Sequence, residues 1–97
     1  MLSEADCRLR AKQCLTRIAQ QCGEDLVLMP SPFGMATTLA YTYQTKAYVA
    51  TGDFIHALAG NGPILVNKLT GAVEVAAAVF STEDSIRAFE NRAGKPT

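Results

Sequence analysis

GNGPILVNKLTGAVEV, residues 60–75, holds the pattern that decides the fold. Three consecutive apolar residues, 64–66, predict a β-strand buried on both faces, which is typical of a strand inside a sheet. Residues 67–71 follow as a connection with Gly71 near its end, as in a hairpin that closes with a type I turn and a glycine bulge. The return strand continues with Val73, Val75 and Ala77 on one face. The stretch therefore predicts a β-hairpin with a central first strand.

Residues 60–63 lead into this strand, and their composition predicts a turn. Two glycines and Asn61 tolerate positive φ angles, and Pro63 fixes the direction in which the strand begins. A phosphate-binding loop is the alternative interpretation of a glycine-rich segment. That alternative is disfavoured because the Lys-Ser/Thr pair of such loops is missing and a strand, not a helix, follows.

Both ends of the chain predict helices. Residues 3–22 place apolar side chains on one stripe, with Ser3 as N-cap and Gly23 just past the end. The stripe consists of Cys7, Ala11, Cys14, Leu15, Ile18 and Cys22. A second, shorter helix begins at Ser81 or Thr82 and ends before Gly94 and Pro96, with Ile86 and Phe89 facing inward.

The three cysteines all lie on the first of these helices. At 1.5 Å rise per residue, Cys7 and Cys14 are about 10 Å apart along the axis and Cys14 and Cys22 about 12 Å. A disulfide requires Cα atoms within about 7 Å, so these residues cannot pair within the helix. The number is odd and no zinc or redox spacing occurs, which indicates reduced thiols in the core.

The middle of the chain predicts two more strands. Residues 26–29 form a short strand that the prolines of a loose hairpin loop, 30–34, bring to an end. Residues 36–50 alternate with period two, which places Leu39, Tyr41 and Tyr43 inward. The opposite, free face carries Thr42, Gln44 and Lys46. Residues 51–53 predict a turn and residues 54–60 a helical turn.

These elements together predict the fold class. The order is α–β–β–β–β–α, and few connections are long enough for parallel crossovers. We therefore expect a single α+β domain, residues 1–97, with a small, mostly antiparallel four-stranded sheet. Both helices, the N-terminal one and the short C-terminal one, are expected to pack on one face of that sheet.

Charge and hydropathy exclude several classes of protein. Nine basic residues balance nine acidic ones, which is unlike a nucleic-acid-binding domain. No apolar run approaches the roughly 18 residues of a membrane span, and the first residues lack a signal peptide, so we expect a cytoplasmic protein. Between residues 26 and 66 the only formal charges are Lys46 and Asp53. Any exposed part of this segment is a low-charge surface suited to a protein partner.

Catalytic and metal-binding constellations are not evident in the sequence. A nucleophilic thiol would have to reach His56, the only histidine, while the cysteines lie on a helix face assigned to the core. A zinc site would need the same scattered cysteines, and Asp53 has no second carboxylate beside it to work as an acid–base pair. The three tyrosines could stack nucleic-acid bases, but two core tyrosines, Tyr41 and Tyr43, and one interface tyrosine, Tyr48, are favoured. We expect no enzyme activity, no cofactor and no metal.

One longer stretch, YVATGDFIHALAGNGPILVNKLTGAVEV, residues 48–75, resembles the immunity protein 35 family, also called YrhB-like. The features shared with the family are the aromatic strand residues Tyr41 and Tyr43, the Thr51-Gly52-Asp53 turn, the segment from Leu58 to Pro63, the apolar strand, Thr70-Gly71, and Ile86 with Phe89. The similarity covers roughly residues 26–90. The chain departs from the family in lacking its central tryptophan and in a thinner acidic run in the last helix.

The resemblance implies a non-enzymatic protein that binds a bacterial toxin, encoded beside it, and occludes the toxin's active site. An interface of this kind needs aromatic or similar anchors, for which Phe33, Tyr48 and Phe54 are the candidates. Lys46 and Asp53 are further candidates, and loops 30–35 and 51–62 form the expected rim. Two alternatives stay open: a general protein-binding or chaperone-like module, and an enzyme with a Cys–His pair.

Overall fold

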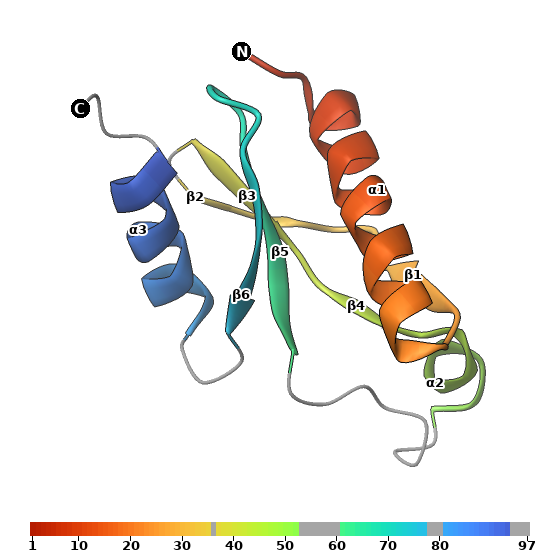
Figure 1. Cartoon of the computed structure of the whole chain (residues 1–97). Helices are drawn as coiled ribbons and strands as arrows, with labels where there is room; N and C mark the ends of the chain where they lie inside the picture. Colours follow the sequence, from red (N-terminus) through yellow and green to blue (C-terminus); the bar gives the residue numbers. More distant parts are fainter. Residues whose placement is uncertain (36, 53–60, 78–80, 94–97) are drawn as a thin grey trace.

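The computed structural model describes residues 1–35, 37–52, 61–77 and 81–93 (Figure 1). Three helices and six strands make up the described chain, and the α+β class predicted from the sequence is confirmed. In chain order they are α1 (Glu4–Cys22), β1 (Leu26–Leu28), β2 (Phe33–Met35), β3 (Thr38–Tyr41), β4 (Tyr43–Thr45), α2 (Lys46–Thr51), β5 (Asn61–Asn67), β6 (Val73–Ala77) and α3 (Thr82–Ala93).

The main sheet has four antiparallel strands in the order β2-β3-β5-β6, and β1 pairs with β4 in a separate two-stranded ladder. Strand β5 lies inside the main sheet, as its apolar run predicts. Ile64, Leu65 and Val66 are each 0% exposed. A strand that is buried on both faces needs a covering layer on each of them.

The first four strands form one long, interrupted hairpin. Leu28 is opposite Tyr43 in the β1–β4 ladder, and the Met29 N–H extends it by donating to the Thr42 carbonyl at 2.9 Å. After residues 30–32, pairing resumes with Phe33 opposite Ala40. The predicted hairpin loop at 30–34 is therefore wrong. The prolines interrupt the ladder because they cannot donate, but residues 33–35 have N–H groups and pair again as β2.

The prediction of one strand over residues 36–50 is wrong beyond residue 45. Helix α2 begins at Lys46, because the Thr45 side chain accepts a hydrogen bond from the Tyr48 N–H at 3.0 Å and so caps the helix. Gly52 ends it in the left-handed region, at φ 70°. The predicted turn at 51–53 is thus the last residue of α2 and its cap, with Asp53 outside the described residues. The predicted helical turn at 54–60 lies outside them too.

Residues 61–63 belong to β5 and not to a turn, which corrects the sequence prediction. The β5–β6 register shifts between Asn61 and Ile64, so Gly62 and Pro63 lie opposite a single residue of β6. This is a β-bulge, a place where a strand tolerates proline because no ladder donor is needed there. At the other end of β5 the prediction of a glycine-dependent turn is confirmed. Gly71 has φ 77° and donates to the Asn67 carbonyl at 2.8 Å.

The two long helices cover opposite faces of the main sheet (Figure 1). Helix α1 packs Cys7, Ala11, Cys14 and Leu15 against Leu39, Tyr41, Ile64 and Val66. Helix α3 packs Ile86 and Phe89 against Ala40, Leu65 and Ala76. The prediction that both helices share one face is wrong, because neighbours on β5 point to opposite sides and both sides are apolar. The predicted free face is partly covered, since Ala40 is buried under α3, whereas Thr42 and Lys46 are exposed.

Both ends of α1 are capped as the sequence predicts. Ser3 accepts from the Asp6 N–H, and Gly23 adopts φ 73°. The apolar stripe is only partly correct: Cys7 and Cys14 are buried, but Cys22 is exposed. Burial declines along the stripe, since Ile18 is half-buried and Cys22 exposed.

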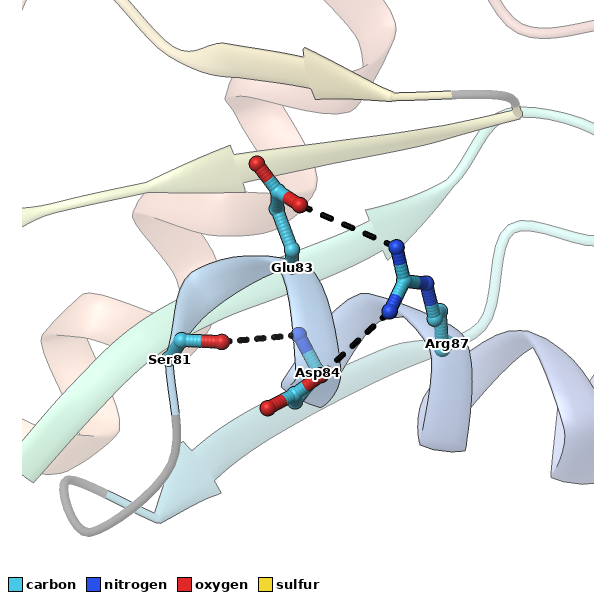
Figure 2. Close-up of polar contacts among 4 residues, drawn as sticks. All are labelled: Ser81, Glu83, Asp84 and Arg87. Atoms are coloured by element: carbon cyan, nitrogen blue, oxygen red, sulfur yellow. Dashed lines mark hydrogen bonds and ion pairs between the residues drawn. The ribbon is translucent and has the colours of Figure 1, made fainter.

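Ser81, one of the two predicted caps, caps helix α3. The Ser81 hydroxyl accepts from the Asp84 N–H at 3.1 Å (Figure 2). Arg87 forms ion pairs with Glu83 at 3.8 Å and Asp84 at 3.5 Å, all on exposed side chains. Pairs of this kind contribute little stability, so α3 is held mainly by its buried face. Gly94 and Pro96 lie outside the described residues.

Candidate functional site

The structure separates the candidate interface residues predicted from the sequence. Phe33 is 46% exposed on β2, at the edge of the main sheet. Lys46 is exposed and Tyr48 half-buried, both on α2. Figure 1 shows β2 and α2 at different ends of the molecule, so Phe33 does not share a surface with the other two. Asp53 and Phe54 lie outside the described residues.

Helix α2 presents small apolar side chains outward. None of its residues is buried, and Val49 is 50% exposed, with Ala47 and Ala50 exposed beside it. A short helix that buries no side chain contributes little to a core. Its exposed surface is nearly free of charge, since Lys46 is its only ionisable side chain apart from Tyr48. This is the kind of surface that the charge pattern of residues 26–66 predicts.

A shallow groove runs beside α2, between the C-terminal half of α1 and strand β1. It has a volume of about 660 Å³ and adjoins a second hollow of about 460 Å³ against α2 itself. Both hollows are lined by Glu24, Asp25 and Lys46. We call the two together the α2-end groove. Its apolar wall consists of Leu15, Ala19, Leu26 and Val27.

Glu24, Asp25 and Lys46, the charged residues of the α2-end groove, form no ion pair with any other residue that the structure describes. Only Lys46 among these residues was predicted from the sequence. The others were missed because Glu24 and Asp25 read as a polar connection, and Leu15 and Leu26 read as core. The groove exists only in the folded chain, where α1, β1 and α2 come together.

The opposite end of the sheet is tied together by a polar network. The Glu90 carboxylate on α3 accepts from the Thr37 N–H at 3.1 Å and from the hydroxyls of Thr37 and Thr38, each at 2.8 Å. Partial burial opposes ionisation of Glu90, but these three donors outweigh it and lower its pKa. Asn67, 1% exposed, donates to the Thr37 hydroxyl and accepts from the N–H groups of Leu69 and Thr70. All of these groups have structural partners.

The thiols and phenols of the described residues lie mainly in the core. Burial raises the pKa of the Cys7 and Cys14 thiols, which keeps them protonated at neutral pH. Burial also raises the pKa of Tyr41 and of Tyr43, the two predicted core tyrosines. The Tyr43 hydroxyl is buried and has no hydrogen-bond partner among the described residues. The Cys–His alternative stays a prediction, since His56 lies outside the described residues.

Within residues 1–35, 37–52, 61–77 and 81–93, no cluster of three or more His, Cys, Asp or Glu side chains is arranged to hold a metal ion. None of the described helices combines the length and apolar character of a membrane span. Comparison with known protein families, with curated proteins and with solved structures found no match.

Proposed function

We propose that this chain is a non-enzymatic, cytoplasmic immunity protein that binds a cognate bacterial toxin and occludes its active site. The resemblance of residues 26–90 to the immunity protein 35 family is one support. The observation that carries the proposal is the exposed apolar face of α2 beside the α2-end groove. Contiguous apolar surface beside a hollow is a common feature of sites that bind another protein.

The chemistry of this surface suits inhibition by coverage. A tight interface depends on a few well-packed anchors surrounded by contacts that exclude water. Val49 and the half-buried ring of Tyr48 supply apolar contact area on α2, and Lys46 supplies a charge at the rim. A toxin seated on this end of the molecule would lose access to its own substrate without any chemical step by the immunity protein.

The test uses the toxin domain encoded beside this gene. Cells that express the toxin domain alone should stop growing, and co-expression of this protein should restore growth. The purified proteins should form a one-to-one complex, measured by isothermal titration calorimetry. Val49→Asp on α2 should weaken that complex, while Leu69→Asp, at an exposed leucine on the β5–β6 turn, should not.

The proposal is refuted if the wild-type protein does not bind the toxin domain and does not restore growth. Weak binding to many unfolded proteins, unchanged by Val49→Asp, would instead support the chaperone-like alternative.

A further inference from the structure

Strand β1 has one open edge. In an antiparallel ladder, alternate residues direct their backbone N–H and C=O groups to the paired strand, and the residues between them direct theirs away. Lys46 N–H donates to the Asp25 carbonyl, and Met29 N–H donates to the Thr42 carbonyl, each at 2.9 Å. Residues 25, 27 and 29 therefore bond toward β4. The backbone groups of Leu26 and Leu28 point away from β4 and have no backbone partner in the described chain.

The α2-end groove lies along this open edge. Leu26 and Val27 of β1 form one wall, and α1 supplies the other with Leu15, Thr16 and Ala19. Leu28 is buried and lines neither hollow, so an extended peptide beside β1 would hydrogen-bond to the backbone of Leu26. Its side chains alternate between two sides with period two, so every second one would enter the groove against α1.

The charge of the groove indicates which peptide fits. Glu24 and Asp25 are exposed, line both hollows and form no ion pair with another described residue, and Lys46 is the one opposing charge among the residues that line the hollows. The balance of these charges is negative. A lysine or arginine on the incoming segment would therefore find an unpaired carboxylate where β1 begins.

We propose that the open edge of β1 binds an extended segment of the partner protein, which adds as a further strand to the β1–β4 ladder. The segment alternates apolar residues, which enter the α2-end groove, and carries a lysine or arginine that pairs with Glu24 or Asp25. Strand addition of this kind derives affinity from main-chain hydrogen bonds and specificity from alternate side chains. The inference rests on the proposed function and specifies which surface of the protein performs it.

The main test blocks the groove from the helix side. Ala19→Arg places a long side chain beside the open edge, and Thr16→Arg does so from an exposed position of the same helix. Each should raise the Kd for the toxin domain about 30-fold or more, the effect of losing a central contact. Ala5→Arg is the matched control, because it adds the same side chain at an exposed alanine of α1 away from the groove. Its Kd should stay within about twofold of wild type.

A charge-reversal pair tests the basic residue on the partner. Glu24→Lys combined with Asp25→Lys should raise the Kd about tenfold at low salt, and less at high salt. Glu83→Lys makes the same type of reversal on α3 and should leave the Kd unchanged. Circular dichroism and melting curves of each variant confirm that the fold is retained.

Amide hydrogen exchange gives a readout that only strand addition would move. The N–H group of Leu26 should exchange fast in the free protein and become protected on addition of the toxin domain. The Val27 N–H, which bonds to β4, should be protected in both states. Val75→Lys tests whether the partner segment adds to the edge strand β6 instead, where Val75 is 39% exposed.

The outcomes separate the two proposals. If wild type fails to bind the toxin domain, the proposed function fails. If wild type binds and Ala19→Arg and Thr16→Arg bind equally well, the β1 edge is refuted while the proposed function stands. Unchanged exchange at Leu26, or loss of binding only in Val75→Lys, would also refute it.

Discussion

Replacing Glu90 by alanine should destabilise the fold far more than the exposure of a half-buried carboxylate suggests. The side chain accepts three hydrogen bonds, two from Thr37 and one from Thr38. Hydrogen bonds to a charged group contribute about 1.5–3 kcal/mol each, but water can replace those at the half-buried Thr37. Thr38 is 0% exposed, so its hydroxyl would be left unsatisfied at a cost of about 1–3 kcal/mol. We expect a total loss of about 3 kcal/mol in the free energy of unfolding.

Urea unfolding followed by circular dichroism measures this loss. For a domain of this size, about 3 kcal/mol lowers the melting temperature by more than about 10 °C. The matched control is Glu83→Ala on the same helix, which removes an exposed ion pair and should cost less than about 1 kcal/mol. A loss at Glu90→Ala no greater than that of the control would refute the claim that this network fastens α3 to the sheet.

The same residue predicts a pH dependence. Its hydrogen bonds hold the pKa of Glu90 below its usual value. A lowered pKa in the folded state stabilises the fold above the unfolded pKa, about 4.3, and the stabilisation is lost as the pH falls through the folded value. The stability difference between wild type and Glu90→Gln should therefore shrink as the pH is lowered from about 6 to about 3. A constant difference would show that the charge of Glu90 contributes nothing to the stability of the fold.

Three further substitutions and one labelling reaction test the packing. Tyr43→Phe should be neutral or stabilise the fold by up to about 1 kcal/mol in urea unfolding, because it removes a buried hydroxyl without a partner; a loss above that size would contradict the assignment. Iodoacetamide should label Cys22 alone in the native protein and all three thiols after unfolding, and mass spectrometry would expose any second native adduct. Gly71→Ala and Gly23→Ala should each lower the free energy of unfolding by about 1 kcal/mol, because both glycines have positive φ. An unchanged free energy of unfolding in both variants would contradict this argument from backbone geometry.

Much of the fold follows from local signals in the sequence. Ser3, Gly23, Ser81 and Gly71 end or connect elements where their side chains or backbone freedom predict it. The apolar run at 64–66 correctly places β5 inside the sheet. In each case the deciding interaction lies within a few residues of the signal, so no knowledge of the rest of the chain is needed.

The errors arise where two local signals compete. Thr45 fits an alternating strand as well as it fits an N-cap, and the structure uses it as both the last residue of β4 and the cap of α2. The prolines of residues 30–32 end pairing locally, but only the ladder with β3 decides whether pairing resumes at Phe33. Which face of the sheet each helix covers depends on tertiary packing. An apolar strand predicts that both faces are buried, but it does not indicate which helix covers each face.

The candidate site was harder to predict for a related reason. Phe33, Lys46 and Tyr48 were selected for residue type, and the structure brings only the last two together. The α2-end groove depends on where α1 and β1 end, and Ala19 and Leu26 resemble ordinary core residues in the sequence. Residue type predicts the kind of surface, whereas its position depends on the three-dimensional arrangement.

The distribution of polar contacts gives the two ends of the molecule different tolerance to change. At one end the network of Glu90 and Asn67 joins α3 to the hairpin turns, and the Leu2 N–H and the Arg10 side chain bond to the backbone of the β5–β6 turn. Substitutions there leave buried donors without acceptors. At the other end α2 buries no side chain, and the charges of the groove form no ion pairs within the described part of the chain. Substitutions on α2 should therefore leave the stability of the fold nearly unchanged, which makes α2 suited to variants that probe the proposed binding surface.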